Sequence, residues 1–248
     1  MGPKSMPAST VCLSDDCEGA ISASIMDVSP PVIIPDDTCG YPLESFHIPA
    51  YYDKDLEKVL IPKGLIDDRT RKLAELIHSR LKDKPIVALC VLKGAFRFYN
   101  TLIDHLLELR RSKNGGETTY PIYYDFLRLK SYANDSSTGD VQVIGANPLA
   151  QLRGKHVLVV EDIVDTGMTM KKMFSLLNEH NPASMSMVTL LLKRTPRAVQ
   201  GGGYRPDYIG FEIPDRFVVG YGLDYNEAFR DLNHVCVVSS AGIEKYKA

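Results

Sequence analysis

From about residue 66 onward, segments of two kinds alternate along the chain: continuous apolar runs, and segments in which apolar residues recur at helical spacing. Continuous apolar runs, typical of buried strands, occupy Ile86 to Leu92, Lys155 to Val160 and Met185 to Leu192. Apolar residues at helical spacing indicate amphipathic helices at 69 to 81, from 94 to 109 and at 170 to 178. Strands that alternate with helices of this length predict an α/β fold with a mostly parallel sheet covered on both faces.

The rest of the chain departs from this alternation in three places. Residues 1 to 36 show no apolar period and predict a flexible tail before a single domain at 37–248. Tyr120 to Leu129 is strand-like, and the polar stretch Lys130 to Gln151 after it predicts a long functional or disordered loop. Short strands are expected at Tyr208 to Glu212, Phe217 to Gly220 and His234 to Val238.

Composition narrows the class of protein. The 248 residues are 44% hydrophobic and 24% charged, with a formal net charge of −2. That balance argues against a chain-wide nucleic-acid surface or a polybasic membrane surface, and no apolar run reaches the length of a transmembrane helix. The five cysteines form no C-x-x-C pair, so neither a disulfide framework nor a zinc site is expected. Without an export signal, the expected location is cytoplasmic.

The most informative segment runs from Val157 to Thr169, where an apolar strand leads into three acids and then Thr-Gly-x-Thr at the start of a helix. The first backbone N–H groups of a helix lack partners and carry partial positive charge, so they bind phosphate. Glu161 and Asp162 at the carboxyl end of the strand suit a sugar diol or the water shell of a metal ion. In isolation, the Thr-Gly turn is typical of an ordinary helix cap, and the acid pair is typical of a solvated strand end. Found together after an apolar strand, the two features favour a ligand site.

Residues Glu161 to Thr169 resemble the signature of the type I phosphoribosyltransferases, which use 5-phosphoribosyl-1-pyrophosphate. Further segments resemble the hypoxanthine-guanine phosphoribosyltransferases, especially the animal ones, over about residues 30 to 248; they are Val91–Gly94, Leu129–Tyr132, Leu191–Arg197, Phe217–Glu227 and Phe229–Cys236. The resemblance implies a type I phosphoribosyltransferase fold with a small hood subdomain formed from parts of 37–66 and 204–248. It implies transfer of the 5-phosphoribosyl group to hypoxanthine or guanine, which gives IMP or GMP plus pyrophosphate, with Mg²⁺ as cofactor.

The resemblance also implies roles for particular residues toward the ribosyl pyrophosphate. Asp165 would be the catalytic residue that accepts a proton from the purine ring. Glu161 and Asp162 would hold the ribose hydroxyls and, with Asp224, the magnesium ion. The remaining phosphate contacts would come from backbone and side chains at Lys93, Gly94, Thr166, Gly167, Met168, Thr169 and Arg230.

The purine and the lid have their own implied residues. Lys193 would donate to the 6-oxo oxygen, Phe217 would stack on the ring and the backbone of Val218 would bind its edge. Lys130, Ser131 and Tyr132 would open a lid that closes over the site.

One position departs from the animal pattern, and two alternative functions stay open. Many animal members have Lys where this chain has Met168, which puts one side-chain contact in doubt. The chain could instead be a catalytically weak nucleotide-binding paralogue, or an enzyme with another acceptor, of which xanthine remains possible. The expected partners are the two small-molecule substrates and further copies of the chain in a homo-oligomer, a dimer or tetramer, with no nucleic acid and no membrane.

Overall fold

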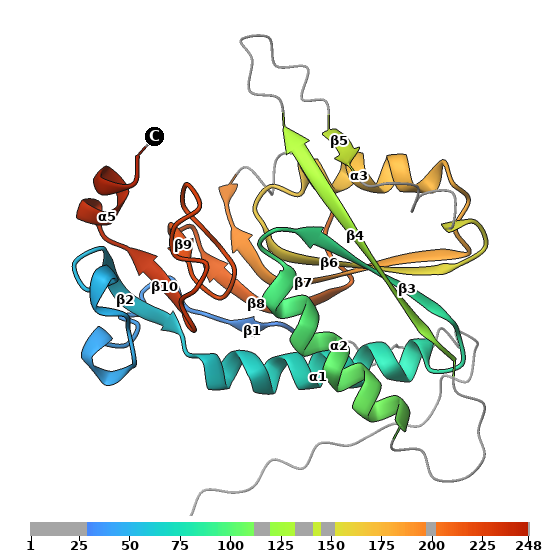
Figure 1. Ribbon diagram of the computed structural model, residues 1–248, viewed down its shortest axis with the longest axis horizontal. Helices are drawn as coiled ribbons and strands as arrows, with labels where there is room; N and C mark the ends of the chain where they lie inside the picture. The colour runs from blue at the N-terminus through green and yellow to red at the C-terminus, as the bar shows by residue number, and fades with distance from the viewer. Residues whose placement is uncertain (1–28, 112–119, 132–140, 145–151, 197–201, 248) are drawn as a thin grey trace, which may run out of the picture.

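The computed structural model describes residues 29–111, 120–131, 141–144, 152–196 and 202–247. Its main sheet has seven strands in the order β1-β8-β7-β6-β3-β4-β5 (Figure 1). Neighbouring strands pair in parallel except β4 with β5, which confirms the predicted mostly parallel sheet. The strands are β1 (Val32–Ile33), β3 (Ile86–Leu92), β4 (Ile122–Ser131), β5 (Val141–Ile144), β6 (His156–Val164), β7 (Ser184–Arg194) and β8 (Tyr208–Pro214).

Helices cover both faces of this sheet. On one face lie α1 (Lys63–Leu81) and α2 (Phe96–Arg111), and on the other lies α3 (Met168–Asn178) (Figure 1). The alternation of strand side chains supplies both cores: Ala88 of β3 packs in the cluster that contains the buried residues of α1 and α2, and Leu89 packs in the cluster that contains those of α3. Strands buried on both faces explain the continuous apolar runs in the sequence.

Several element boundaries differ from the prediction, most of all in α1 and β6. Helix α1 begins at Lys63 instead of residue 69, because the apolar face continues one turn earlier through the fully buried Ile66. Strand β6 continues to Val164 instead of ending at Val160, because Ile163 and Val164 still pair with β7. The predicted loop at 162–169 is therefore reduced to Asp165–Gly167, since α3 already begins at Met168.

The predicted long polar loop, Lys130 to Gln151, contains strand residues in the part that the structure describes. Strand β4 extends to Ser131, and β5 pairs with it in antiparallel register, with Ser131 opposite Val141 and Arg128 opposite Ile144. The β-branched residues of Val141–Ile144 are typical of such a strand. Tyr132 and the other residues of 132–140 and 145–151 lie outside the described part of the chain.

A second, three-stranded antiparallel sheet joins segments from both ends of the chain. Its order is β2-β10-β9, with β2 at Leu56–Ile61, β9 at Val218–Val219 and β10 at Val235–Val238. We call it the small sheet. Two 3-10 turns (Leu43–Ser45 and Ala50–Tyr52) and α5 (Ser240–Lys245) accompany it, and its outer core includes Tyr52, Phe229 and Cys236. The division of the chain into tail, domain and hood stays a prediction.

The first strand lies within the stretch that hydropathy assigned to the tail. Val32 and Ile33 pair with Phe211 and Glu212 of β8. The guanidinium of Arg69 also holds this segment, because its Nη2 donates to the Pro30 carbonyl at 2.8 Å. A two-residue strand leaves too short a pattern for hydropathy to detect, and its partner lies far away in sequence.

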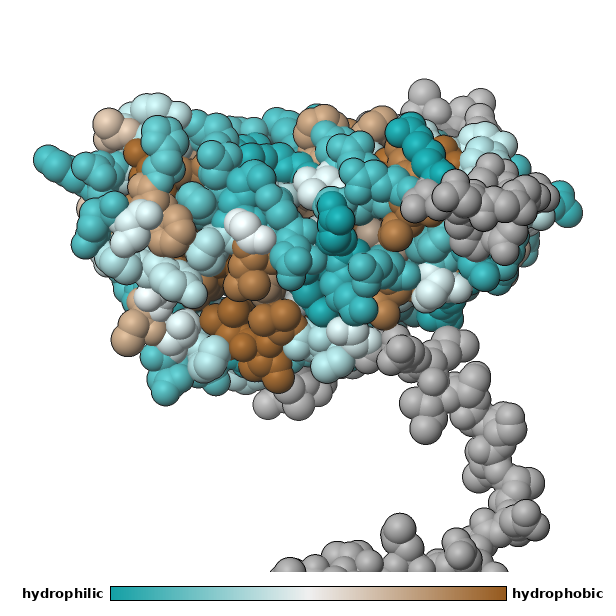
Figure 2. All heavy atoms as spheres, turned by 90° about the horizontal axis from the view of Figure 1, so that it is seen from below, coloured by the Kyte–Doolittle hydropathy of each residue, from teal (hydrophilic) through white to brown (hydrophobic). Residues whose placement is uncertain are grey.

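The outer surface on the side of α1 and α2 is mostly hydrophilic, with a few compact hydrophobic patches, as Figure 2 shows from below the view of Figure 1. Among the described residues, no helix combines the length and the apolar character needed to cross a bilayer.

Candidate active site

The carboxyl ends of the central parallel strands bring most of the predicted site residues together. Lys93 and Gly94 follow β3, Asp165 follows β6 and Lys193 lies near the end of β7. Parallel strands end at the same edge of the sheet, where α/β proteins bind ligands. A cavity of about 350 Å³ lies there, lined by predicted residues that include Lys93, Gly94, Glu161, Asp162, Asp165, Thr166, Gly167, Thr169, Asp224 and Arg230.

The turn between β6 and α3 has the geometry of a phosphate-binding loop. Gly167 is the N-cap of α3 with φ +74°, the left-handed conformation that glycine adopts without steric cost. A Cβ on Gly167 would lie 2.5 Å from the Tyr204 carbonyl oxygen, so only glycine fits. The Thr166 hydroxyl accepts a hydrogen bond from the Met168 backbone N–H at 3.4 Å. The positive end of α3 therefore faces the cavity with its first N–H groups.

Glu161 is a buried acid with an unused oxygen. It is 7% exposed, and within the described part of the chain its buried Oε2 has no hydrogen-bond partner. Burial, followed by repulsion from Asp162, raises the pKa of Glu161 well above its ordinary range. A buried carboxylate oxygen without a partner is costly, and a cation or sugar hydroxyls would remove that cost.

The acid pair fits a magnesium ion that is completed by a substrate. No group of three or more acidic, histidine or cysteine residues among the described ones could enclose a metal ion. Mg²⁺ commonly binds through one or two carboxylates together with substrate phosphates and water. Glu161 and Asp162 match that mode, because they adjoin the phosphate loop and line the same cavity.

Gly94 allows two segments of the site to approach each other. A Cβ at this position would lie 1.6 Å from Oδ2 of Asp162, so any side chain would displace that carboxylate. The Gly94 carbonyl oxygen is also the atom that a Cβ on Gly222 would meet, at 2.2 Å. The peptide bond between Leu92 and Lys93 just before it is cis.

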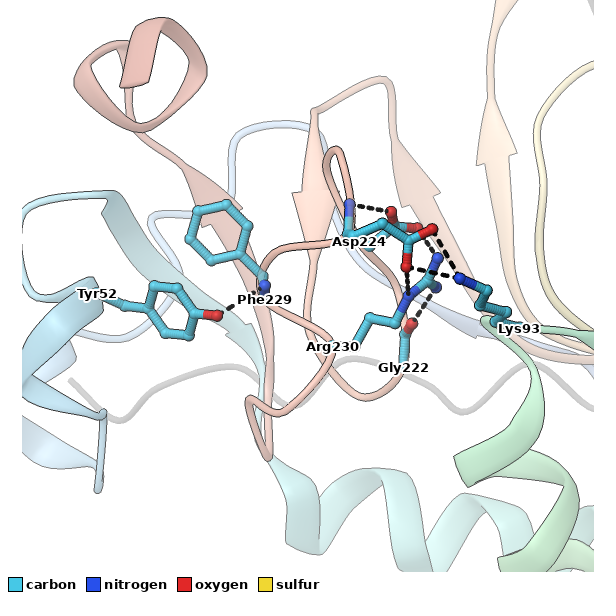
Figure 3. Close-up of polar contacts among 7 residues, drawn as sticks. Tyr52, Lys93, Gly222, Asp224, Phe229 and Arg230 are labelled. Atoms are coloured by element: carbon cyan, nitrogen blue, oxygen red, sulfur yellow. Dashed lines mark hydrogen bonds and ion pairs between the residues drawn. The ribbon is translucent and has the colours of Figure 1, made fainter. Parts of the chain in front are cut away.

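Charged side chains cluster on the loop after β9. Arg230 Nη2 lies 2.8 Å from Oδ1 of Asp224, and Arg230 Nη1 donates to the Gly222 carbonyl at 2.9 Å. Figure 3 shows that Asp224 and Arg230 of this loop and Lys93 at the end of β3 converge on one group of polar contacts. The centre of that group is Glu227, whose Oε1 and Oε2 each accept a hydrogen bond from Lys93 Nζ at 2.9 Å.

A second cavity, of about 230 Å³, contains the residues expected to bind a purine. Lys193, Phe217 and Val218 line it together with Asp162, Asp165 and Asp224. The Lys193 ammonium lies 3.6 Å from Oδ1 of Asp215. Phe217 is 41% exposed and meets the Tyr225 ring edge-on, with centroids 5.0 Å apart. Asp162, Asp165 and Asp224 line both cavities and so lie where they meet.

One predicted residue lies outside these cavities, and the predicted lid residues are described only in part. Met168, at the first turn of α3, is 41% exposed and does not line either one. Lys130 and Ser131 end β4 beyond Leu129, which does line the larger cavity, and Tyr132 lies outside the described residues.

Sequence reasoning missed Glu227 and Tyr52. Glu227 stood in the matched Phe217–Glu227 segment without a role, although an acid in a turn beside expected phosphate-binding cations was a usable signal. Tyr52 hydrogen-bonds to the backbone N–H of Phe229 at 2.9 Å across the small sheet (Figure 3). No pattern near Tyr52 in the sequence indicates that partner.

Comparison with known proteins places the chain among transferases. Residues 61–226 match the family model described as the phosphoribosyl transferase domain. The chain is 56% identical over 220 residues to hypoxanthine-guanine phosphoribosyltransferase of Sus scrofa, an alignment that covers 89% of this chain and 98% of that protein. It is 54% identical to the Homo sapiens protein over the same shares of both chains.

A solved structure agrees with these relatives. The crystal structure of hypoxanthine-guanine phosphoribosyltransferase from Schistosoma mansoni in complex with IMP matches with a TM-score of 0.72. The match has 38% sequence identity and covers 88% of this chain and 100% of that one.

Proposed function

The chain belongs to the hypoxanthine-guanine phosphoribosyltransferase family, and we propose that the residues around the two cavities carry out this family's reaction. The enzyme transfers the 5-phosphoribosyl group from 5-phosphoribosyl-1-pyrophosphate to hypoxanthine or guanine in purine salvage. In this reaction the bond between ribose C1 and the pyrophosphate oxygen breaks, and a bond from C1 to a purine nitrogen forms. The products are IMP or GMP and pyrophosphate.

One observation carries the assignment of roles: Asp165 lies at the junction of the two cavities together with Asp162 and Asp224. Of these three acids, Asp162 is assigned to the ribose, and the two oxygens of Asp224 are held by Arg230 and by the Glu227 backbone N–H. The purine would occupy the cavity with Phe217 and Lys193, and the ribosyl pyrophosphate would occupy the cavity with the phosphate loop. The bond that forms lies between the two, so Asp165 would accept the proton that leaves the purine nitrogen. Proximity and orientation across the junction would supply much of the rate enhancement.

The larger cavity, which contains the phosphate loop, would hold 5-phosphoribosyl-1-pyrophosphate through several types of group. The first turn of α3, with Thr166, Gly167 and Thr169, would bind the 5′-phosphate through backbone N–H groups and hydroxyls. Lys93 and Arg230 would bind pyrophosphate, since both cations line this cavity. Met168 would contribute its backbone only, because its side chain lies outside the lining.

Glu161 and Asp162 would hold the ribose hydroxyls and a magnesium ion. When bound, Mg²⁺ neutralises charge on the pyrophosphate and templates the reacting groups. The partnerless Oε2 of Glu161 supports this proposal. Asp224 would join them only after a change of partners, because its two oxygens are held by Arg230 and by the Glu227 backbone N–H.

The purine cavity would select 6-oxopurines. The Lys193 ammonium would donate to the 6-oxo oxygen, and a 6-amino group would leave that buried cation facing a donor. Its side chain is only 13% exposed, so the penalty would be substantial. Hypoxanthine and guanine both present the required oxygen.

The test is an assay of IMP and GMP formation with 5-phosphoribosyl-1-pyrophosphate, Mg²⁺ and each base. We expect turnover with both bases, and none with adenine. In the same assay, Asp165→Asn should lower kcat by about 10²- to 10⁴-fold while GMP still binds. Asp104→Asn, an exposed acid on α2, is the matched control and should keep full activity. Absence of turnover with either base would refute the function, and an unchanged kcat for Asp165→Asn would remove Asp165 from the mechanism.

Two further expectations accompany this function. The described cysteines Cys39, Cys90 and Cys236 are free thiols, which supports a reducing, cytoplasmic location. A homo-oligomer, either a dimer or a tetramer, is expected, and sedimentation of the purified protein would distinguish the two states.

A further inference from the structure

Glu227 joins the two cations that the proposed function assigns to pyrophosphate. Its carboxylate contacts Lys93 Nζ through both oxygens at 2.9 Å, and its Oε2 lies 3.5 Å from Nε of Arg230. Lys93 follows β3, whereas Arg230 lies in the loop between β9 and β10, so the acid links two segments far apart in sequence (Figure 3). It therefore bridges the two cations, through hydrogen bonds from Lys93 and a longer ion pair with Arg230, whose buried Nε has no hydrogen-bond partner within the described part of the chain.

The backbone at Glu227 has an unusual conformation for this residue type. Tyr225 and Ala228 exchange two backbone hydrogen bonds, at 3.2 and 3.0 Å, around Asn226 and Glu227. These two central residues have φ of +48° and +69°, as in a type I′ turn. Asn is favoured in such turns, but Gly normally occupies the second position, where a side chain costs about 1–2 kcal/mol. A glutamate kept in this position indicates a role for its side chain.

The contacts of Glu227 are the contacts that a bound pyrophosphate would need. Lys and Arg side chains are hydrogen-bond donors only, and phosphate oxygens compete for the same N–H groups as a carboxylate. Attraction to these cations, led by the hydrogen bond from Lys93, lowers the pKa of Glu227, so the side chain is an anion at neutral pH. Pyrophosphate would therefore have to displace one anion to bind.

From these contacts we infer that Glu227 is a positioning residue that holds Lys93 and Arg230 as an internal anion and is displaced by pyrophosphate. It keeps the two cations arranged for the substrate, and it takes them back when pyrophosphate leaves. The inference rests on the proposed function. It means that Glu227 weakens the binding of pyrophosphate and speeds its release.

The test measures pyrophosphate binding directly in the full chain. Magnesium pyrophosphate is titrated into the wild type and into Glu227→Gln by isothermal calorimetry. The variant keeps the size of the side chain but removes its charge, so it should bind roughly three- to tenfold more tightly, as expected for the loss of two exposed ion pairs. The KM for 5-phosphoribosyl-1-pyrophosphate should fall in parallel, and kcat should fall if pyrophosphate release limits turnover.

Two more variants keep the result interpretable. Glu227→Gly also removes the carboxylate and relieves the left-handed turn, so it should bind more tightly without a lower Tm. Glu244→Gln, an exposed acid on α5 that pairs with Lys247, should leave the affinity unchanged. Equal or weaker binding by both Glu227 variants would overturn the inference, since a purely structural role predicts weaker binding. If the wild type binds magnesium pyrophosphate but gives no turnover, the proposed function fails and this inference is judged on the affinities alone.

Discussion

Two loops form the proposed phosphate side of this site, and they are built in opposite ways. The loop between β6 and α3 is short and continuous, and it takes its chemistry from a strand end and a helix start. The loop between β9 and β10 is long and is shaped by its backbone. Of the five non-glycine residues with positive φ in the described chain, four lie in it: Tyr221, Asn226, Glu227 and Phe229.

The second loop depends on distant contacts to keep its shape. The buried Tyr221 hydroxyl lies 3.1 Å from the Thr101 hydroxyl of α2, and the Tyr52 hydroxyl accepts from the Phe229 N–H. The first loop needs few such supports, because regular elements on both sides fix it. Changes in the β6–α3 loop should therefore act on chemistry, and changes around the β9–β10 loop should act on position.

The largest effect is expected at Gly94, which lies between the end of β6 and the β9–β10 loop. In Gly94→Ala the new Cβ would displace the Asp162 carboxylate, and a misplacement of about 1 Å can cost about 10²-fold in rate. We expect kcat/KM to fall by at least about 10²-fold in the steady-state assay. The control is Gly64→Ala in the first turn of α1, where a Cβ meets nothing within 4 Å. Activity within tenfold of wild type for Gly94→Ala would show that the loops do not depend on this close approach.

A smaller effect is expected from loosening the β9–β10 loop alone. Tyr52→Phe leaves the buried N–H of Phe229 without its partner, and such a loss costs about 1–3 kcal/mol. The free energy of unfolding in urea should fall by that amount. The KM for 5-phosphoribosyl-1-pyrophosphate should rise a few-fold while kcat changes little, because Arg230 follows Phe229 directly.

Tyr51 provides the matched control for this change. Its hydroxyl donates to Asp231, as does that of Tyr52, but the Tyr51 side chain is 61% exposed. Water can replace the lost contact in Tyr51→Phe, so its stability and KM should stay close to those of the wild type. Equal losses in both variants would mean that Asp231, and not the Phe229 N–H, is the partner that matters.

The smallest effect is expected from Glu161 in β6, just before the β6–α3 loop, and here the substitution should stabilise the protein. The raised pKa of Glu161 means that the folded protein holds this proton more tightly than the unfolded chain does. The free energy of unfolding therefore falls as the pH rises from the ordinary value, near 4.5, through the raised pKa, and the penalty persists above it. Glu161→Gln removes that penalty. With EDTA at pH 7 its Tm should be higher by about 2–4 °C, which corresponds to about 1 kcal/mol for a chain of this size.

Two further measurements on Glu161→Gln complete this test: the pH dependence of the gain in Tm, and the enzymatic activity. The gain in Tm should shrink as the pH is lowered toward 4.5, because the wild-type carboxyl is then protonated too. Turnover should fall in the same variant, since an amide cannot bind Mg²⁺ as a carboxylate does. A variant that is less stable than the wild type at pH 7 would show that the ionised Glu161 is not a cost to the fold.

The predictable parts of the fold are those with local patterns. The run Ile86–Leu92 forms β3 with the expected ends, because a strand buried on both faces is apolar throughout. The start of helix α1 was predicted at residue 69 instead of Lys63, because its first turns have a single buried residue before Arg69. Strands β1 and β2 were not expected at all. Each pairs with a segment near the other end of the chain, and such pairing leaves no periodic signal.

The same distinction holds for the site. The sequence indicated Asp165 and Gly167 because strand, acids and helix start follow one another without interruption. It did not reveal the role of Glu227, which depends on a turn with two left-handed residues and on a lysine that follows another strand. It did not indicate Tyr52 either, because the partner is a backbone N–H. Side-chain types can be read along a chain, whereas such backbone partners arise only from the fold.

The small sheet combines strands that are far apart in the sequence, and this affects the order in which the protein folds during synthesis. Ile61 of β2 pairs with Val235 of β10, so nearly the whole domain is translated between the two partners. During synthesis the main sheet can assemble as its strands emerge, but β2 must wait with its apolar residues uncovered until β10 leaves the ribosome. The loop that carries Arg230 lies between β9 and β10, and it gains its supports only at that stage. The enzyme should therefore acquire its proposed pyrophosphate site only after β10 has emerged, later than the main sheet.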